Sequence, residues 1–137
     1  MSRIFNCVTH ALRIEDRIDK APKDLDWRKT PLEALKELAG QYDLQVRSID
    51  EVSRQELYPG EWRICFFGWV PIRWDRADDN RVILCDYHLV RQESDGGWTH
   101  RETWGADSQV ADLPKLIAEY RSAGYEPRYF AIRRSGT

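Results

Sequence analysis

The chain has 137 residues, of which 42% are hydrophobic and 32% charged, and its formal net charge is −2. This length predicts a single domain over residues 1–137 with a core of its own, and the composition is typical of a soluble globular protein rather than a disordered one. The small net charge argues against nucleic acid or an anionic membrane surface as the partner.

The sequence also lacks a run of about 18 apolar residues, the length that a membrane-spanning helix needs. The first residues have no apolar segment of the kind found in secretory signals. Three cysteines form an odd set, which argues against a disulfide framework and for a reducing compartment. We therefore expect a cytoplasmic protein, with export by a route that uses no cleaved signal left open.

The first predicted element is a helix over residues 6–14. Asn6 is a suitable N-cap, and four residues recur at helical spacing on one face, namely Cys7, His10, Ala11 and Ile14. Charges of both signs alternate over residues 15–29, which predicts a loop.

A capping motif then predicts a second helix. Thr30 is the N-cap, Pro31 occupies the first helical position, and Glu33 completes the capping box. A third, shorter helix is predicted over residues 49–57, ended by the Pro-Gly pair at positions 59 and 60.

The second half of the chain is rich in β-forming residues. Its predicted elements are a strand over 62–70 that ends near Pro71, a polar loop over 75–81, strands over 82–92 and 98–104, a helix over 112–121 capped by Gly124, and a strand over 128–134. Helices followed by antiparallel strands predict an α+β domain in which the helices pack on one side of a small sheet.

Cys7 and two histidines are the candidate catalytic residues. A thiol at a helix N-terminus has a lowered pKa, and the N–H groups of the first turn can stabilise an oxyanion. An imidazole can take the thiol proton while a second polar group orients the ring. The alternative is that Cys7 is a small core residue that packs beside Ala11 and Ile14.

The turn at residues 94–97 decides whether His88 and His100 meet. A two-residue loop at 95 and 96 would send the two side chains to opposite faces. A three-residue loop over 94–96, with Gly96 in the left-handed region, would put His88 opposite Glu102 and make His100 its diagonal neighbour.

This pattern resembles the papain-like cysteine hydrolases, and most closely the NlpC-type cell-wall hydrolases. The resemblance rests on Cys7 at a helix start, on the twelve-residue step from His88 to His100, and on the aromatic strand over 60–67 that precedes the base histidine. Val8 and Thr9 depart from the Ser-Gly that follows the cysteine in that family.

The resemblance implies a papain-like fold and hydrolysis of an amide or peptide bond by a thiol peptidase or amidase. Cys7 would be the nucleophile, His88 the general base and acid, and His100 the orienting residue, with Asp86 or Glu102 as the fallback for that third role. The substrate would be a peptide, a peptidoglycan-like molecule or a protein, with acyl transfer also open, and neither a cofactor nor a metal is expected.

Two other functions stay open. The first is a catalytically inactive binding module of the same fold. The second is a small zinc-stabilised domain, because two Cys-x-x-His motifs offer four ligands, namely Cys7, His10, Cys85 and His88.

Overall fold

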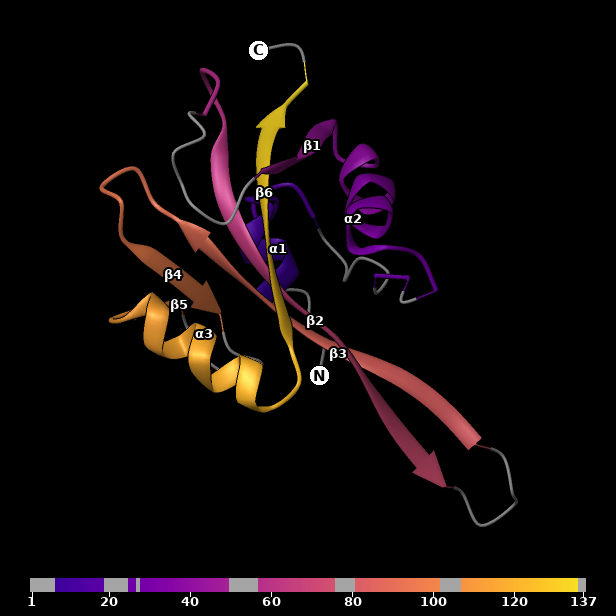
Figure 1. The fold of residues 1–137 in the computed structure, drawn as a ribbon. Coiled ribbons are helices and arrows are strands. Elements are labelled where there is room, and N and C mark those ends of the chain that lie inside the picture. Colours follow the sequence, from indigo (N-terminus) through magenta and orange to yellow (C-terminus); the bar gives the residue numbers. More distant parts are fainter. Residues whose placement is uncertain are drawn as a thin grey trace.

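The computed structural model describes residues 7–18, 25–26, 28–49, 57–75, 81–101 and 107–135, with backbone alone over 69–75 and 81–86. It has three short helices and a six-stranded antiparallel sheet (Figure 1). The helices are α1 (Cys7–Ala11), α2 (Pro31–Gly40) and α3 (Leu113–Ser122), and the strands are β1 (Leu44–Ile49), β2 (Trp62–Asp75), β3 (Arg81–Gln92), β4 (Trp98–Arg101), β5 (Asp107–Val110) and β6 (Glu126–Arg134).

The strand order in the sheet is β1-β6-β2-β3-β4-β5. The central strand β2 is buried from Trp62 to Phe67, as expected for a strand that is covered on both faces. Since successive side chains of a strand point to opposite faces, this one strand contributes to two separate cores.

The first core, here called the first cluster, joins α1 and α2 to one face of the sheet. Its buried members are Val8, Ala11, Leu12, Ile14, Leu25, Ala34, Leu35, Leu38, Ala39, Leu44, Val46, Trp62, Ile64, Phe66, Leu89, Phe130 and Ile132. The indole of Trp62 donates a hydrogen bond of 2.8 Å to the carbonyl of Ala11, which fixes the end of α1 on the sheet.

The second cluster lies on the other face of the sheet. Its buried members are Ile49, Cys65, Phe67, Val90, Tyr129 and Ala131, and the apolar side chains of α3 pack against them. The α+β class is thus confirmed, whereas the expectation that all helices lie on one side of the sheet is wrong, because α3 covers the face opposite α1 and α2.

Several predicted elements differ from the observed ones in their bounds. The first helix is shorter than predicted because Arg13 has a φ of 54°, in the left-handed region that ends a helix. β2 continues through Pro71 to Asp75, where it pairs with β3, and its described ladder with β6 stops at Gly68. Pro71 has no N–H group for a ladder hydrogen bond, and this is tolerated where a strand has a neighbouring strand on one side only.

Strands β1 and β5 were not predicted. A helix was predicted over residues 49–57, but Ile49 ends β1 and Leu57 is not helical. Residues 50–56 of that predicted helix lie outside the described residues. By contrast, α2 begins as predicted, with Thr30 accepting a hydrogen bond of 3.2 Å from the backbone N–H of Glu33.

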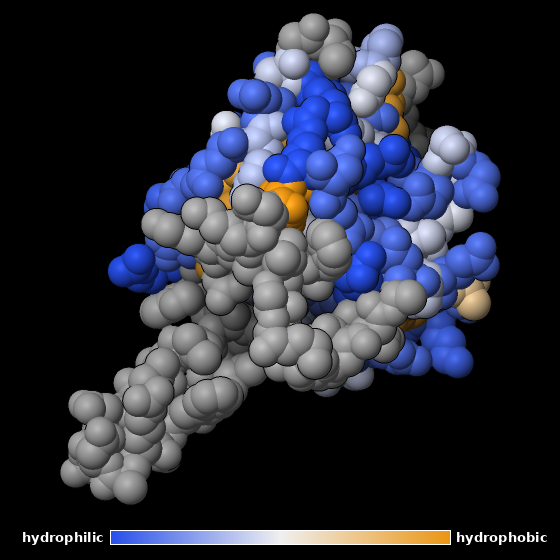
Figure 2. Space-filling view, turned by 180° about the vertical axis from the view of Figure 1, so that it is seen from behind, coloured by the Kyte–Doolittle hydropathy of each residue, from blue (hydrophilic) through white to orange (hydrophobic). Residues whose placement is uncertain are grey.

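The surface of the described residues is mainly polar. Among the residues coloured by hydropathy on the face seen in Figure 2, hydrophilic ones predominate and hydrophobic areas are small. Tyr58 is the single large hydrophobic residue of the described ranges that is exposed. Within those ranges, no helix combines the length and the apolar character that a membrane crossing requires.

Candidate functional site

The turn between β3 and β4 has the three-residue form. The backbone N–H of Glu93 donates a hydrogen bond of 2.7 Å to the carbonyl of Gly97, which closes a loop over residues 94–96. Gly96 has a φ of 88°, in the left-handed region. The ladder then pairs Arg91 with Thr99, so the odd register predicted from the sequence is confirmed.

This register brings the two candidate histidines together. Nε2 of His88 lies 2.8 Å from Nδ1 of His100, and the rings meet edge to face with centroids 5.0 Å apart. The side chains leave from the same face of the hairpin and are both half-buried. They form a hydrogen-bonded imidazole pair, here called the histidine pair.

An aromatic stack positions the histidine pair. The ring of Tyr120, from α3, stacks on His88 with centroids 5.6 Å apart and an interplanar angle of 9°. Tyr120 also stacks on Phe67 of β2 at 4.5 Å, so one phenol ring links His88 to the second cluster. Stacking of this kind limits rotation of the His88 ring and so keeps its nitrogens in fixed directions.

Cys7, the predicted nucleophile, is the first residue of α1 and is half-buried against the first cluster. His88 stacks instead on Tyr120, which belongs to the second cluster. The two clusters lie on opposite faces of the sheet. The structure therefore brings together two of the three predicted residues and packs the third on the other face of the sheet.

The predicted zinc ligands are also divided by the sheet. The ring of His10 contacts Thr99, whose side chain lies on the face of β4 opposite that of His100. His10 and His88 are thus on opposite faces and cannot share a metal ion. The side chains of Cys85 and Asp86, and the whole of Glu102, lie outside the described residues.

A buried polar network around His10 is the feature that sequence reasoning missed. His10 is 1% exposed, its Nε2 lies 2.9 Å from Oγ1 of Thr99, and its backbone carbonyl accepts a hydrogen bond of 2.6 Å from Nη1 of Arg91. Burial, reinforced by the nearby charge of Arg91, lowers the pKa of His10 to about 4. The imidazole is therefore neutral at pH 7.

Glu93 anchors one end of this network. Its Oε1 accepts hydrogen bonds from Oγ1 of Thr99 at 2.7 Å and from both Nε and Nη2 of Arg91. Burial alone would raise the pKa of Glu93, but the hydrogen bonds from Thr99 and Arg91 outweigh it and lower the pKa below the usual value. Glu93 is therefore a carboxylate that accepts hydrogen bonds.

At the other end, His10 faces two more carboxylates. Its Nδ1 lies 3.2 Å from Oδ1 of Asp107 and 3.6 Å from Oε1 of Glu15. Arg101 bridges the same two acids, with Nη2 at 2.9 Å from Oε2 of Glu15 and 3.0 Å from Oδ1 of Asp107. The acids are distant in sequence and follow no spacing rule, so the sequence carried no signal for this group.

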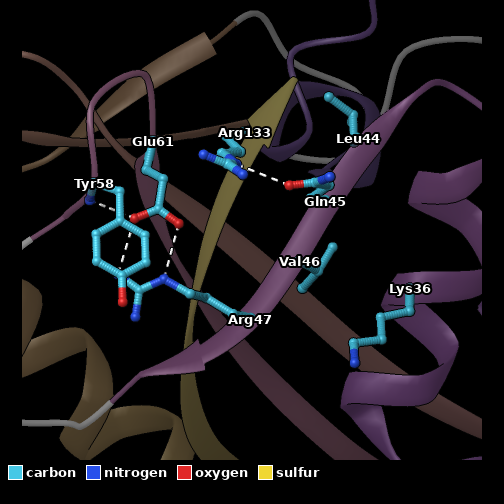
Figure 3. A pocket seen from close by; sticks show the side chains of 8 residues that line it. All are labelled: Lys36, Leu44, Gln45, Val46, Arg47, Tyr58, Glu61 and Arg133. Carbon is cyan, nitrogen blue, oxygen red and sulfur yellow. Dashed lines mark hydrogen bonds and ion pairs between the residues drawn. The ribbon is translucent and has the colours of Figure 1, made fainter. Parts of the chain in front are cut away.

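A cavity of about 410 Å³ lies elsewhere, beside the edge strand β1, and its lining includes Lys36, Arg47 and Arg133. Figure 3 shows Arg47 between Glu61 and Tyr58, with Lys36 apart on α2. Arg47 forms two hydrogen bonds to the Glu61 carboxylate, at 2.8 and 2.9 Å. The interactions drawn join lining residues to one another, which is the pattern of a structural ion pair.

Comparison of the chain with protein-family models, with curated proteins and with solved structures finds no significant match. The papain-like fold and the NlpC-type relationship therefore stay predictions from the sequence. The geometry above is what carries the functional argument.

Proposed function

We propose that this protein is a cysteine hydrolase of amide or peptide bonds, with the histidine pair as its acid–base group. The observation that carries the proposal is the contact of 2.8 Å between His88 and His100. A base histidine held by a second polar group is the arrangement that thiol hydrolases use. Cys7 is the proposed nucleophile.

The contact assigns a role to each nitrogen of His88. If Nε2–H of His88 donates to Nδ1 of His100, then Nδ1 of His88 carries the lone pair and acts as the base. In a reacting complex that brings Cys7 to this nitrogen, the nitrogen would take the proton from the thiol as the sulfur attacks the substrate carbonyl carbon, and would return that proton to the leaving amine. Water then hydrolyses the thioester and regenerates the thiol.

Attack requires the sulfur of Cys7 to lie within about 4 Å of the His88 ring in the reacting complex. α1 packs directly against β3 and β4, the two strands that carry the histidines, but on their other face. This separation favours a second candidate, a binding module of the same architecture in which the thiol and the histidine pair do not react together.

Thiol reactivity distinguishes the two candidates. We would alkylate the full chain with iodoacetamide at pH 6 and follow Cys7 and Cys65 by mass spectrometry, in the wild type and in His88→Asn. Cys65 is fully buried and is an internal control for unfolding. An activated thiol predicts that Cys7 reacts about tenfold faster in the wild type than in His88→Asn.

Equal labelling rates of Cys7 in both proteins, with Cys65 unlabelled, would reject the cysteine hydrolase and favour the binding module. Circular dichroism of His88→Asn checks that the variant is folded. A second readout is the release of new amino groups from peptide or peptidoglycan fragments, which Cys7→Ala should abolish.

A further inference from the structure

Three potential ligand atoms converge beside α1, on the face of the sheet opposite the histidine pair. They are Nδ1 of His10 and one carboxylate oxygen each from Glu15 and Asp107, and all lie within 4.8 Å of one another. They come from three separate segments, namely α1, the turn that follows it, and β5.

The hydrogen bonds around Thr99 assign the tautomer of His10. Thr99 donates its hydroxyl proton to the Glu93 carboxylate, so its oxygen can only accept from Nε2–H of His10. The other ring nitrogen, Nδ1, is then the one that a ligand can reach, and it faces two carboxylate oxygens. Nδ1 is buried and has no hydrogen-bond partner.

Two carboxylates held close together repel, and a buried polar atom without a partner is destabilising. A cation placed among the three atoms would remove both costs. We propose that His10, Glu15 and Asp107 bind a divalent transition-metal ion, with zinc as the closest fit. Imidazole nitrogen and carboxylate oxygen are both zinc ligands, and an open zinc site has three protein ligands and a water molecule.

The surroundings suit a bound ion. The side chain of Asp107 is 44% exposed and that of Glu15 is 24% exposed, so an ion can enter from solvent and can keep a water ligand. Arg101 donates to Oε2 of Glu15 at 2.9 Å and to Oδ1 of Asp107 at 3.0 Å, so it contacts both acids, while Oε1 of Glu15 faces His10 without a contact to Arg101. Arg101 would thus orient the carboxylates from outside the ligand set.

Isothermal titration of the full chain with Zn²⁺ tests the site, using protein freed of metal by a chelator. Glu15→Gln and Asp107→Asn keep the side-chain shape but weaken the ligand, and the control Asp16→Asn removes an exposed neighbouring charge. We expect one equivalent of Zn²⁺ to bind. Each ligand variant should bind at least about tenfold more weakly, and the control should stay within about twofold.

Cysteines and the histidine pair offer Zn²⁺ other ligands, so two further measurements identify the site. His100→Asn should keep the affinity of the wild type, and the Co²⁺ complex should lack a thiolate charge-transfer band. Failure of Zn²⁺ to bind, or binding that is lost in His100→Asn and kept in Asp107→Asn, would overturn the proposal. Thermal unfolding of each variant checks that it is folded.

Discussion

The hydroxyl of Thr99 lies 2.9 Å from Nε2 of His10 and fixes the β3–β4 hairpin to α1. The next residue, His100, points to the other face of the sheet and meets His88. The same four-residue strand therefore holds the buried His10 network on one face and the histidine pair on the other. Displacement of β4 would disturb both at once.

Replacement of Thr99 by valine should destabilise the protein by about 1–3 kcal/mol. Valine keeps the shape and the β-branching, but it leaves the buried Nε2–H of His10 without an acceptor and removes one donor to Glu93. Urea unfolding followed by tryptophan fluorescence measures the change in the free energy of unfolding.

Thr99→Ser is the matched control, because it keeps the hydroxyl and removes only a methyl group. Its effect should be at most about 1 kcal/mol. If the valine and serine variants unfold at the same urea concentration, the hydroxyl of Thr99 does not stabilise the fold.

The register of the hairpin could be predicted from sequence because its determinants are local. Side chains alternate with a period of two, and only a loop of odd length with a left-handed glycine puts His88 and His100 on one face. Gly96 supplies that conformation. No knowledge of the rest of the fold was needed.

The partner of Cys7 could not be predicted in the same way. Helical spacing shows which side of α1 is apolar, but both faces of this sheet are covered by helices, and local sequence does not say which face a helix covers.

β5 was missed for a different reason, because Asp107–Val110 is largely exposed and lacks apolar alternation. β1 alternates between buried and less buried residues over its first four positions, 44–47, so this part of its strand pattern is present in the sequence.

Replacement of Gly96 by alanine should cost about 1–2 kcal/mol of stability. A Cβ at this position meets no atom within 4 Å, so the cost arises from the left-handed backbone alone. Gly40→Ala is the control, since Gly40 also has open space but ends α2 without a positive φ, and alanine there should be neutral or stabilising. Thermal unfolding of the two variants under one condition measures the difference, and equal melting temperatures would contradict the prediction.

The carboxyl group of Glu61 should make the free energy of unfolding depend on pH. The hydrogen bonds from Arg47 hold the pKa of this carboxyl below its ordinary value of 4.5. A group whose pKa is lowered by folding stabilises the native state above its unfolded pKa, and this contribution is lost as the pH falls through the folded pKa. The stabilising effect of Glu61 should therefore be complete at pH 7 and should decline below about pH 4.5.

Glu61→Gln should accordingly be destabilised at pH 7, by about 1–3 kcal/mol, because the Glu61 side chain is 3% exposed and the variant leaves Arg47 without its carboxylate partner. The difference between wild type and variant should shrink as the pH falls below about 4.5. Urea unfolding at a series of pH values measures it. Glu119→Gln, which removes the same charge from an exposed position on α3, should change stability by less than about 0.5 kcal/mol. A difference for Glu61→Gln that stays constant from pH 7 to pH 3 would show that the ionised carboxylate is not what stabilises this end of the sheet.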